Sequence, residues 1–289
     1  TGIAPFHKEF PQYSYDVGVA ESNMISMAAG MSKLGFLPIV DTFVAFGATK
    51  GNLPLIMASL SEAPVMALFT HLGFQDAADG ASHQSLTYFS ALCSIPNTTI
   101  ICPASSKEAE KLVESCLEKM QQEKQGKDHV HNYIFVTGRE DAPSQFGFED
   151  QATFGVPRLL KQGKQGLIVT QGNLLGEGLA AVEILKTKGF DFGLVHHPFL
   201  NSFEKTAWKN FLSQSGGVLL SVEDHQEKGG IGSFLLAQIQ NELPGILKKG
   251  RILGVKNSFG QSAYNSIDLY KHHGLDAHGI AKTAQEMLT

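Results

Sequence analysis

Residues 65–84 read VMALFTHLGFQDAADGASHQ, a short apolar run followed by a long polar loop. The apolar part, Val65–Thr70, has the length expected of a strand that is buried in a parallel sheet. The polar part, His71–Gln84, leads into a predicted helix at Ser82–Ser94. In open α/β sheets such a loop lies at the carboxyl end of its strand, where these folds bind ligands.

The same alternation of apolar runs and amphipathic stretches continues on both sides of this unit. Predicted strands in the first half are Tyr13–Val17, Leu37–Asp41, Val65–Thr70, Thr99–Cys102 and Tyr133–Val136. Predicted helices are Ser22–Leu34, Ser82–Ser94 and Ser106–Glu123, the last with a Ser before it and early acidic residues. This βαβ rhythm predicts a mostly parallel sheet with helices on both faces.

The rhythm is interrupted once and then resumes, which predicts two domains. Residues 145–163 are rich in Gly and Pro and are expected to link domain 1–144 to domain 164–289. The second domain is predicted to contain strands Leu167–Thr170, Phe192–Val195, Val218–Val222 and Ile252–Val255, and helices Leu174–Lys188, Glu204–Gln214, Gly232–Glu242 and Ala277–Leu288. The expected fold class is therefore α/β, with two three-layer α/β/α domains and mostly parallel sheets.

The composition excludes some classes of protein. Apolar residues are 43% and charged residues 18% of the 289 residues, an ordinary balance for a globular chain. The net charge of -5 argues against a nucleic-acid surface, and no apolar run approaches the length of a membrane span. Cys93, Cys102 and Cys116 fit no metal motif and follow no secretory signal, so we expect a cytoplasmic protein.

Glu21 is the first candidate for chemistry. It follows an apolar run and opens a helix that is rich in small residues. A carboxylate there lies at the carboxyl end of a predicted strand, and the helix N-terminus stabilises its charge. The alternative is an acid that only stabilises the first turn of its helix.

The loop after Val65–Thr70 is the second candidate, because His71, Asp79 and His83 occur in it together. Imidazoles can move protons near neutral pH, and a carboxylate can orient a hydroxyl. A metal site is disfavoured, because the spacing is not that of a zinc motif and no thiolate is near. The alternative is a surface loop whose polar side chains cap turns.

Phe43, Phe46 and Arg139 also follow predicted strands. An aromatic ring at a strand's carboxyl end can face a flat ligand, although such rings more often belong to the core. Arg139 offers a fork of donors that suits a phosphate. The stretch Gly229–Gly232 could hold an anion at a helix N-terminus, but close packing of helix and sheet explains it better.

Four segments, in this order, resemble the transketolase family. Residues 16–24, DVGVAESNM, are similar to the signature that opens its pyrimidine-binding helix, and residues 42–46, TFVAF, to its TF-x-x-F segment. Residues 79–84, DGASHQ, resemble its substrate loop, and 222–225 with 229–232, VEDH and GGIG, a segment of its C-terminal domain. The resemblance covers essentially the whole chain and implies a pyrimidine-binding domain followed by a transketolase C-terminal domain.

The resemblance implies a role for each candidate. Glu21 would hydrogen-bond the pyrimidine ring of thiamine diphosphate, Phe46 would stack on that ring, and Phe43 would lie beside it. His71, Asp79 and His83 would face the donor sugar, and Arg139 would bind its phosphate. Thr49 stands where many relatives have a larger aromatic residue, which leaves the substrate open.

The resemblance also implies a partner. The family holds Mg²⁺ and the diphosphate with a Gly-Asp-Gly segment, and this sequence contains none. We therefore expect a diphosphate-binding N-terminal half or subunit to hold Mg²⁺, in an α2β2 assembly if the two halves are separate chains. The chain begins at Thr1, and the strand and helix that usually open such a domain are expected to be missing.

Three functions are compatible with these observations. The first is a subunit that transfers a two-carbon ketol unit between sugar phosphates. The second is a relative that uses a 2-oxo acid, such as a deoxyxylulose-phosphate synthase or the β subunit of a 2-oxo-acid dehydrogenase. The third is a non-catalytic partner module of the same fold.

Overall fold

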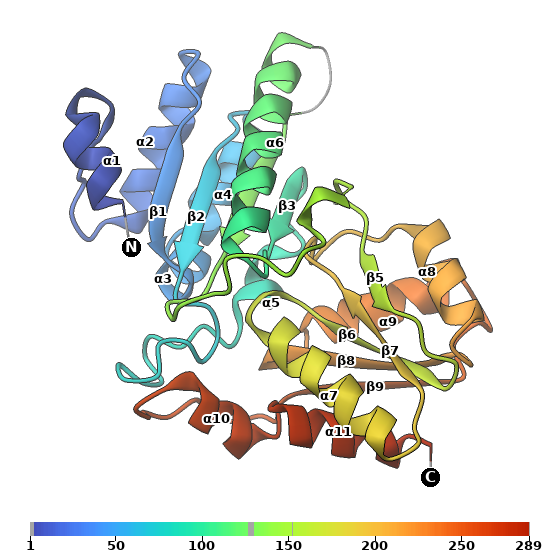
Figure 1. Cartoon of the computed structure of the whole chain (residues 1–289). Helices are drawn as coiled ribbons and strands as arrows, with labels where there is room; N and C mark the ends of the chain where they lie inside the picture. Colours follow the sequence, from blue (N-terminus) through green and yellow to red (C-terminus); the bar gives the residue numbers. More distant parts are fainter. Residues whose placement is uncertain (1–2, 127–129, 152, 289) are drawn as a thin grey trace.

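Two sheets, each with its own helices, make up the computed structural model, which describes residues 3–126, 130–151 and 153–288 (Figure 1). The first half of the chain builds one sheet and the second half builds the other. Both sheets are mostly parallel with helices on both faces. The expected α/β class with two three-layer domains is therefore confirmed.

The first sheet contains four parallel strands in the order β1-β2-β4-β3. Its elements are α1 (Ala4–Glu9), α2 (Glu21–Lys33), β1 (Ile39–Phe43), α3 (Val44–Thr49), α4 (Asn52–Leu60), β2 (Met66–Thr70), α5 (Tyr88–Leu92), β3 (Thr98–Ile101), α6 (Ser106–Gln125) and β4 (Asn132–Val136). Within β4, Ile134 belongs to the core under α2 and α4, and its neighbour Tyr133 to the core under α6. This alternation gives the three layers.

The second sheet has the order β5-β7-β6-β8-β9, and among its described strands only β5 is antiparallel. Its elements are β5 (Arg158–Lys161), β6 (Gly166–Thr170), α7 (Leu175–Thr187), β7 (Phe192–His196), α8 (Lys205–Ser213), β8 (Val218–Gln226), α9 (Ile231–Glu242), β9 (Lys249–Val255), α10 (Ser266–His273) and α11 (Ala277–Glu286). Ile168 of β6 packs with α7 and α11, whereas Leu167 packs with α8 and α9.

The strand predicted at Tyr13–Val17 is wrong. A short 3-10 helix at Pro11–Tyr13 is followed by an exposed loop, in which Tyr13 and Tyr15 are 68% and 65% exposed. The Asp16 side chain accepts a hydrogen bond from the Gly18 N–H at 2.9 Å, and Gly18 has a φ of 69°. This local turn satisfies the backbone in place of a ladder.

The helix predicted at Ser82–Ser94 is reduced to α5. Before Tyr88 the chain forms turns, and Ser85 makes bridges to Leu72 and Gly73. The Ser85 hydroxyl also accepts from the Gly73 N–H at 2.7 Å. Contacts to the opposite end of the loop therefore replace the first turns of this helix.

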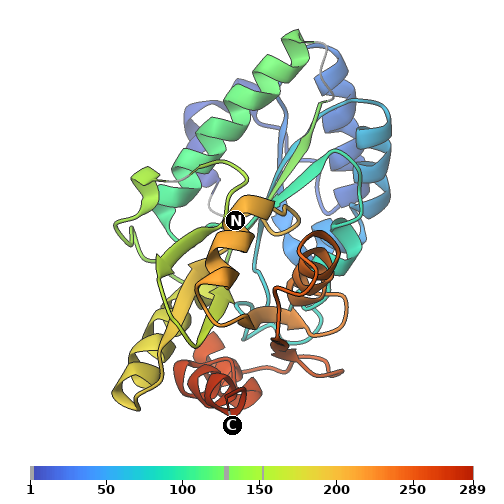
Figure 2. The ribbon, with the colours of Figure 1, turned by 90° about the vertical axis from the view of Figure 1, so that its right-hand side faces the viewer.

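Backbone hydrogen bonds join the two domains, which lie against each other in Figure 2. The Cys102 N–H donates to the Pro198 carbonyl, and the Leu200 N–H donates to the Ile100 carbonyl. These bonds join the end of β3 to the segment after β7. The carboxyl end of the first sheet therefore lies against the second domain.

Candidate functional site

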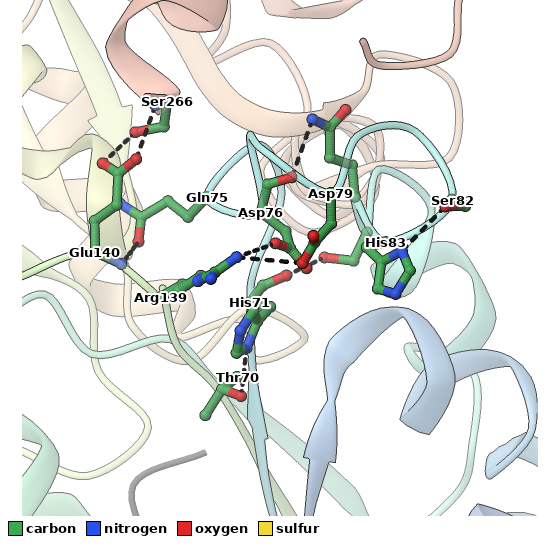
Figure 3. A network of polar contacts seen from close by, with 12 residues as sticks. Thr70, His71, Gln75, Asp76, Asp79, Ser82, His83, Arg139, Glu140 and Ser266 are labelled. Carbon is green, nitrogen blue, oxygen red and sulfur yellow. Dashed lines mark hydrogen bonds and ion pairs between the residues drawn. The ribbon is translucent and has the colours of Figure 1, made fainter. Parts of the chain in front are cut away.

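The candidate residues of the first domain gather at the carboxyl ends of β1, β2 and β4. Phe43 is the last residue of β1, His71 follows β2 directly, and Arg139 follows β4. Because these strands are neighbours in one parallel sheet, residues far apart in the sequence meet at one edge. Figure 3 shows the polar part of this cluster.

Four stacked or edge-on rings form the aromatic part of the site. The Phe43 and His71 rings stack with centroids 3.6 Å apart, and Phe43 and Phe46 stack at 6.0 Å. His83 meets Phe46 edge-on at 5.3 Å. One face of Phe43 is thus covered by His71, whereas Phe46 also lines a cavity.

The cavity beside Phe46 has a volume of about 240 Å³ and includes Thr49, Lys50, Ser82 and Gln84 among its lining residues. An aromatic ring with hydroxyl, amide and ammonium groups suits a flat, polar heterocycle. Thr49 is small, which leaves this space open.

Glu21 lies near this cavity, at the first residue of α2. The hydroxyl of the next residue, Ser22, donates to the Lys50 carbonyl at 2.6 Å, and Lys50 lines the cavity. Glu21 itself is half-buried and is the acidic residue of the first turn of α2, after the N-cap residue Ala20.

His71 has a strained backbone and a shifted acidity. Its φ is 67°, a left-handed conformation that is costly for a residue with a side chain. The side chain is nearly buried, and its Nδ1 lies 2.7 Å from the Thr70 hydroxyl. Burial lowers the pKa of His71, and the charge of Arg139 lowers it further, against the opposing charge of Asp76. The imidazole is thus neutral and able to accept a proton near pH 7.

Arg139 is held by two aspartates of the loop (Figure 3). Its guanidinium lies 2.6 Å from the fully buried Asp76 carboxylate and 3.3 Å from the half-exposed Asp79 carboxylate. Arg139 itself is 46% exposed. Asp79 and Arg139 are thus brought together, although the family resemblance implies a separate partner in the substrate for each of them.

Asp76 was missed as a site residue from sequence alone. It lies in the same loop as Asp79, but only the fold shows that it is the buried partner of Arg139. The clue in the sequence is an aspartate beside apolar and small residues, which favours burial. A buried carboxylate in turn requires an ion pair.

The glycine-rich stretch at 229–232 serves packing, as expected. A Cβ on Gly232 would lie 2.9 Å from the Ser221 and Ile252 side chains. The Gly232 N–H donates to the Glu223 carboxyl at 3.1 Å, so the start of α9 is already occupied by a side chain. Burial raises the pKa of Glu223 to about 8.

Neither a metal cluster nor a membrane span is found in the part of the chain that the structure describes. No three His, Cys, Asp or Glu side chains among residues 3–126, 130–151 and 153–288 are grouped to hold a metal ion. Over the same residues, no helix combines the length and the apolarity that crossing a bilayer requires.

The fold and the site define a two-domain α/β protein whose ligand site lies at the carboxyl edge of its first sheet. The transketolase pyrimidine-binding domain matches residues 1–124, and the transketolase C-terminal domain matches residues 155–280. A Methanocaldococcus jannaschii protein with the name transketolase C-terminal section is 30% identical over 99% of this chain and 86% of its own length. This chain belongs to the transketolase family and corresponds to the C-terminal section of such enzymes.

Other relatives are longer or share the fold. A 1-deoxy-D-xylulose-5-phosphate synthase of Clostridium botulinum is 28% identical over 98% of this chain, which spans only 44% of that enzyme. A split-gene transketolase, solved as an inactive β4 tetramer, aligns with a TM-score of 0.84 and 26% identity, covering 98% of this chain and 86% of that one. A transketolase of Pichia stipitis shares the fold with a TM-score of 0.75 and 20% identity, covering 93% and 36%.

Enzymes of this family use thiamine diphosphate, and the residues present fit its pyrimidine ring. The fit rests on the cavity beside Phe46 and on the half-buried Glu21 near its rim. A flat ring can lie against an aromatic face, and a carboxyl can hydrogen-bond a ring nitrogen.

Proposed function

We propose that this chain is the C-terminal subunit of a thiamine-diphosphate-dependent transferase that moves a two-carbon ketol unit between sugar phosphates. The observation that carries the proposal is the convergence of His71, His83, Asp79 and Arg139 beside the cavity at Phe46. The two imidazoles can carry protons, the carboxylate can accept a hydrogen bond from a hydroxyl, and the guanidinium can bind a phosphate, all next to a surface that suits a flat ring.

Residues of the first domain would hold the cofactor's pyrimidine. When bound, thiamine diphosphate supplies a nucleophilic thiazolium carbon and accepts the electron pair of the cleaved carbon–carbon bond. Glu21 hydrogen-bonds a pyrimidine nitrogen and so fixes the protonation of that ring. Phe46 packs on the ring face, and Phe43 supports it from the side of β1.

Residues of the loop and of β4 would handle the sugar. His71, neutral near pH 7, takes or returns a proton at a donor hydroxyl, and His83 does the same from the opposite end of the loop. Asp79 accepts a hydrogen bond from a sugar hydroxyl. Arg139 binds the terminal phosphate with its exposed part.

A diphosphate-binding N-terminal half or subunit would complete the site. We assign Mg²⁺ and the diphosphate to that partner, because this sequence has no Gly-Asp-Gly segment. The inactive β4 tetramer of a split-gene transketolase supports the need for a second kind of chain. With self-association the assembly becomes α2β2, and the three free cysteines suit a cytoplasmic setting.

The test is ketol transfer from a ketose phosphate to an aldose phosphate, with thiamine diphosphate and Mg²⁺. We expect activity only when this chain is mixed with a transketolase N-terminal section, and a loss of ~100-fold or more in Glu21→Gln. Glu118→Gln, an exposed acid on α6, is the matched control and should keep full activity. Activity of this chain alone would overturn the need for a partner.

A second candidate function is transfer from a 2-oxo acid. The similarity to 1-deoxy-D-xylulose-5-phosphate synthases over nearly all of this chain favours it. The same mixture supplied with pyruvate and an aldose phosphate tests it. Turnover of pyruvate without turnover of the ketose phosphate would replace the first proposal, and a stable but silent complex would indicate a non-catalytic module.

A further inference from the structure

Asp224 is a buried carboxyl of the second domain whose hydrogen bonds reach into the first. It lies near the end of β8 and is 5% exposed. Its two oxygens accept from the Phe74 N–H at 3.1 and 3.0 Å, and one of them also accepts from the Tyr270 hydroxyl at 3.0 Å. Phe74 belongs to the loop that carries His71 and Asp76.

The approach of Asp224 to this loop is very close. A Cβ on Gly73 would lie 2.0 Å from an Asp224 oxygen, so only glycine fits there. Gly73 also has a φ of 57°, which glycine adopts at little cost. The turn at residues 73–74 is therefore shaped around the carboxyl of the other domain.

Further contacts from the second domain hold the rest of the loop. The Ala263 N–H donates to the Ala77 carbonyl at 2.9 Å, and the Gln84 side chain donates to the Gln261 carbonyl at 2.9 Å. The ring of His273, at the end of α10, stacks on Phe74 with centroids 4.7 Å apart. Figure 1 shows α10 alongside the loop.

The turn held by Asp224 lies between the groups that the proposed chemistry needs. His71 precedes Phe74 by three positions, and Asp76, which holds Arg139, follows it by two. The Gly73 N–H is bonded to the Ser85 hydroxyl, which in turn donates to the His71 carbonyl at 3.2 Å. A shift of the turn would therefore move His71 and Asp76 together.

We propose that Asp224 is a positioning residue, through which the C-terminal domain fixes the loop that carries His71 and Asp76. This inference rests on the proposed function, since it assigns a purpose to the placement of that loop. It gives the C-terminal domain a part in the site although none of its side chains has a predicted contact with cofactor or sugar. A displacement of about 1 Å in such a group can lower turnover ~100-fold.

Glu223 provides a matched control on the same strand. Like Asp224 it is buried, and burial raises the pKa of both carboxyls, to about 8 and about 7. Glu223 also accepts a backbone hydrogen bond, but from Gly232 in its own domain. A change at Glu223 thus repeats the loss of a buried acid without touching the loop.

The test is amide hydrogen exchange of the full chain, followed by mass spectrometry of peptides that cover 71–84. We expect Asp224→Ala to speed exchange there by ~10-fold or more, while peptides of the first-domain helix α6 stay unchanged. Asp224→Asn keeps one acceptor for the Phe74 N–H and should restore most of the protection. Glu223→Ala, which removes the acceptor of the Gly232 N–H, should speed exchange at 229–242 instead.

Equal exchange at 71–84 in wild type and Asp224→Ala would overturn the proposal, as would equal effects of Asp224→Ala and Glu223→Ala on exchange at 71–84. If Asp224→Ala does not fold, Tyr270→Phe decides: it should speed exchange at 71–84 but not at 229–242. Unchanged exchange in that variant also overturns the proposal. Exchange needs no turnover, so an inactive wild-type complex would refute the proposed function and leave this result standing.

In the complex with the N-terminal section, the kinetic signature separates positioning from stability. Asp224→Ala should lower kcat/KM for the donor ~10-fold or more while the thiamine diphosphate concentration for half-saturation stays within twofold. Asp224→Asn should recover most of kcat/KM. A loss confined to cofactor binding would contradict the assignment.

Discussion

Arg139 lies between two aspartates of the same loop, and only one of the two is exposed. Asp76 is fully buried and lies 2.6 Å from the guanidinium, whereas Asp79 is half-exposed at 3.3 Å. The ion pair with buried Asp76 fixes the orientation of the Arg139 guanidinium. The ion pair with exposed Asp79 can be exchanged for one with another anion. A phosphate can therefore replace Asp79 without disturbing Asp76.

Asp76→Asn tests this division of roles. Without the buried charge Arg139 loses its anchor, so we expect KM for a phosphorylated donor to rise ~10-fold with little change for the unphosphorylated ketose. Steady-state kinetics of the complex with both donors measures the difference. Asp141→Asn, an exposed neighbour of Arg139 in sequence, should change neither value. Equal effects on both donors would show that Asp76 supports the fold and not the phosphate.

Sequence motifs predict candidate site residues more readily than the contacts that position them. Phe46 and His83 were predicted from motif and strand order, whereas Glu21 was predicted to follow the strand Tyr13–Val17, which the structure does not form. Asp224 was found only as part of a resemblance, since its partner Phe74 lies 150 positions away. Such a contact depends on how two domains pack, which local pattern does not encode.

Helix α6 begins with reciprocal hydrogen bonds. The Ser105 hydroxyl accepts from the Glu108 N–H at 3.2 Å, and the Glu108 carboxylate accepts from the Ala104 N–H at 2.8 Å. The same carboxylate lies 2.9 Å from His196 of the second domain. Burial alone would raise the pKa of Glu108, but the hydrogen bond and charge of His196 outweigh it and hold the pKa below its ordinary value.

Glu108→Ala should therefore lower the free energy of unfolding by more than the loss of a helix cap alone would. It leaves the Ala104 N–H and His196 without their buried partner, and we expect a loss of ~3 kcal/mol in the free energy of unfolding. Glu108→Gln keeps an acceptor and should lose less. Urea denaturation measures both, with Glu110→Ala, an exposed acid on the same helix, as control. A loss within ~0.5 kcal/mol in Glu108→Ala would show that the pair contributes nothing net.

Hydrophobic periodicity mispredicted secondary structure where the sequence pattern does not match the burial of the side chains. Tyr13, Tyr15 and Val17 alternate as in a strand, yet β1 forms the edge of the sheet and no described strand pairs beyond it. Helices α1, α3, α4 and α10 were not predicted. The segment of α4 is apolar on several sides, so it carries no clean 3.6-residue stripe. Strand β5 lies inside the predicted linker 145–163 and pairs with β7.

An apolar surface over α2 and α4 is exposed to solvent. Leu53, Met57 and Leu60 of α4 are 65%, 49% and 73% exposed, and Leu34 beside α2 is 79% exposed. Apolar patches of this kind mark protein contacts. This surface therefore supports the proposed self-association or a contact with the N-terminal section.

Leu53→Glu combined with Leu60→Glu should weaken assembly. Each carboxylate would have to be buried unpaired in a contact made by α4, so we expect the association constant to fall ~100-fold or more. Analytical ultracentrifugation of the chain, alone and with the N-terminal section, measures it. Gln214→Glu with Gln240→Glu adds the same charge on the second domain and should change nothing. Unchanged association in the α4 variant would exclude this surface as the contact.

The stability of the whole chain should depend on pH through His197. This imidazole is fully buried against Trp208, and neither ring nitrogen has a hydrogen-bond partner among the described residues. Burial, and then the neighbouring His196, lower its pKa from 6.5 to about 3. As pH falls below 6.5 the unfolded chain binds a proton that the folded chain refuses, so stability present above pH 6.5 is lost progressively down to about pH 3.

His197→Phe removes this proton and keeps an aromatic ring against Trp208. The free energy of unfolding should then fall less steeply between pH 6.5 and pH 4, by up to ~1.4 kcal/mol per pH unit compared with wild type. Urea denaturation at several pH values measures the slope, and His278→Phe at an exposed position should leave it unchanged. Parallel curves for wild type and His197→Phe would mean that His197 accepts its proton in the folded chain, through a local opening of the junction where His196 and Glu108 join the two domains.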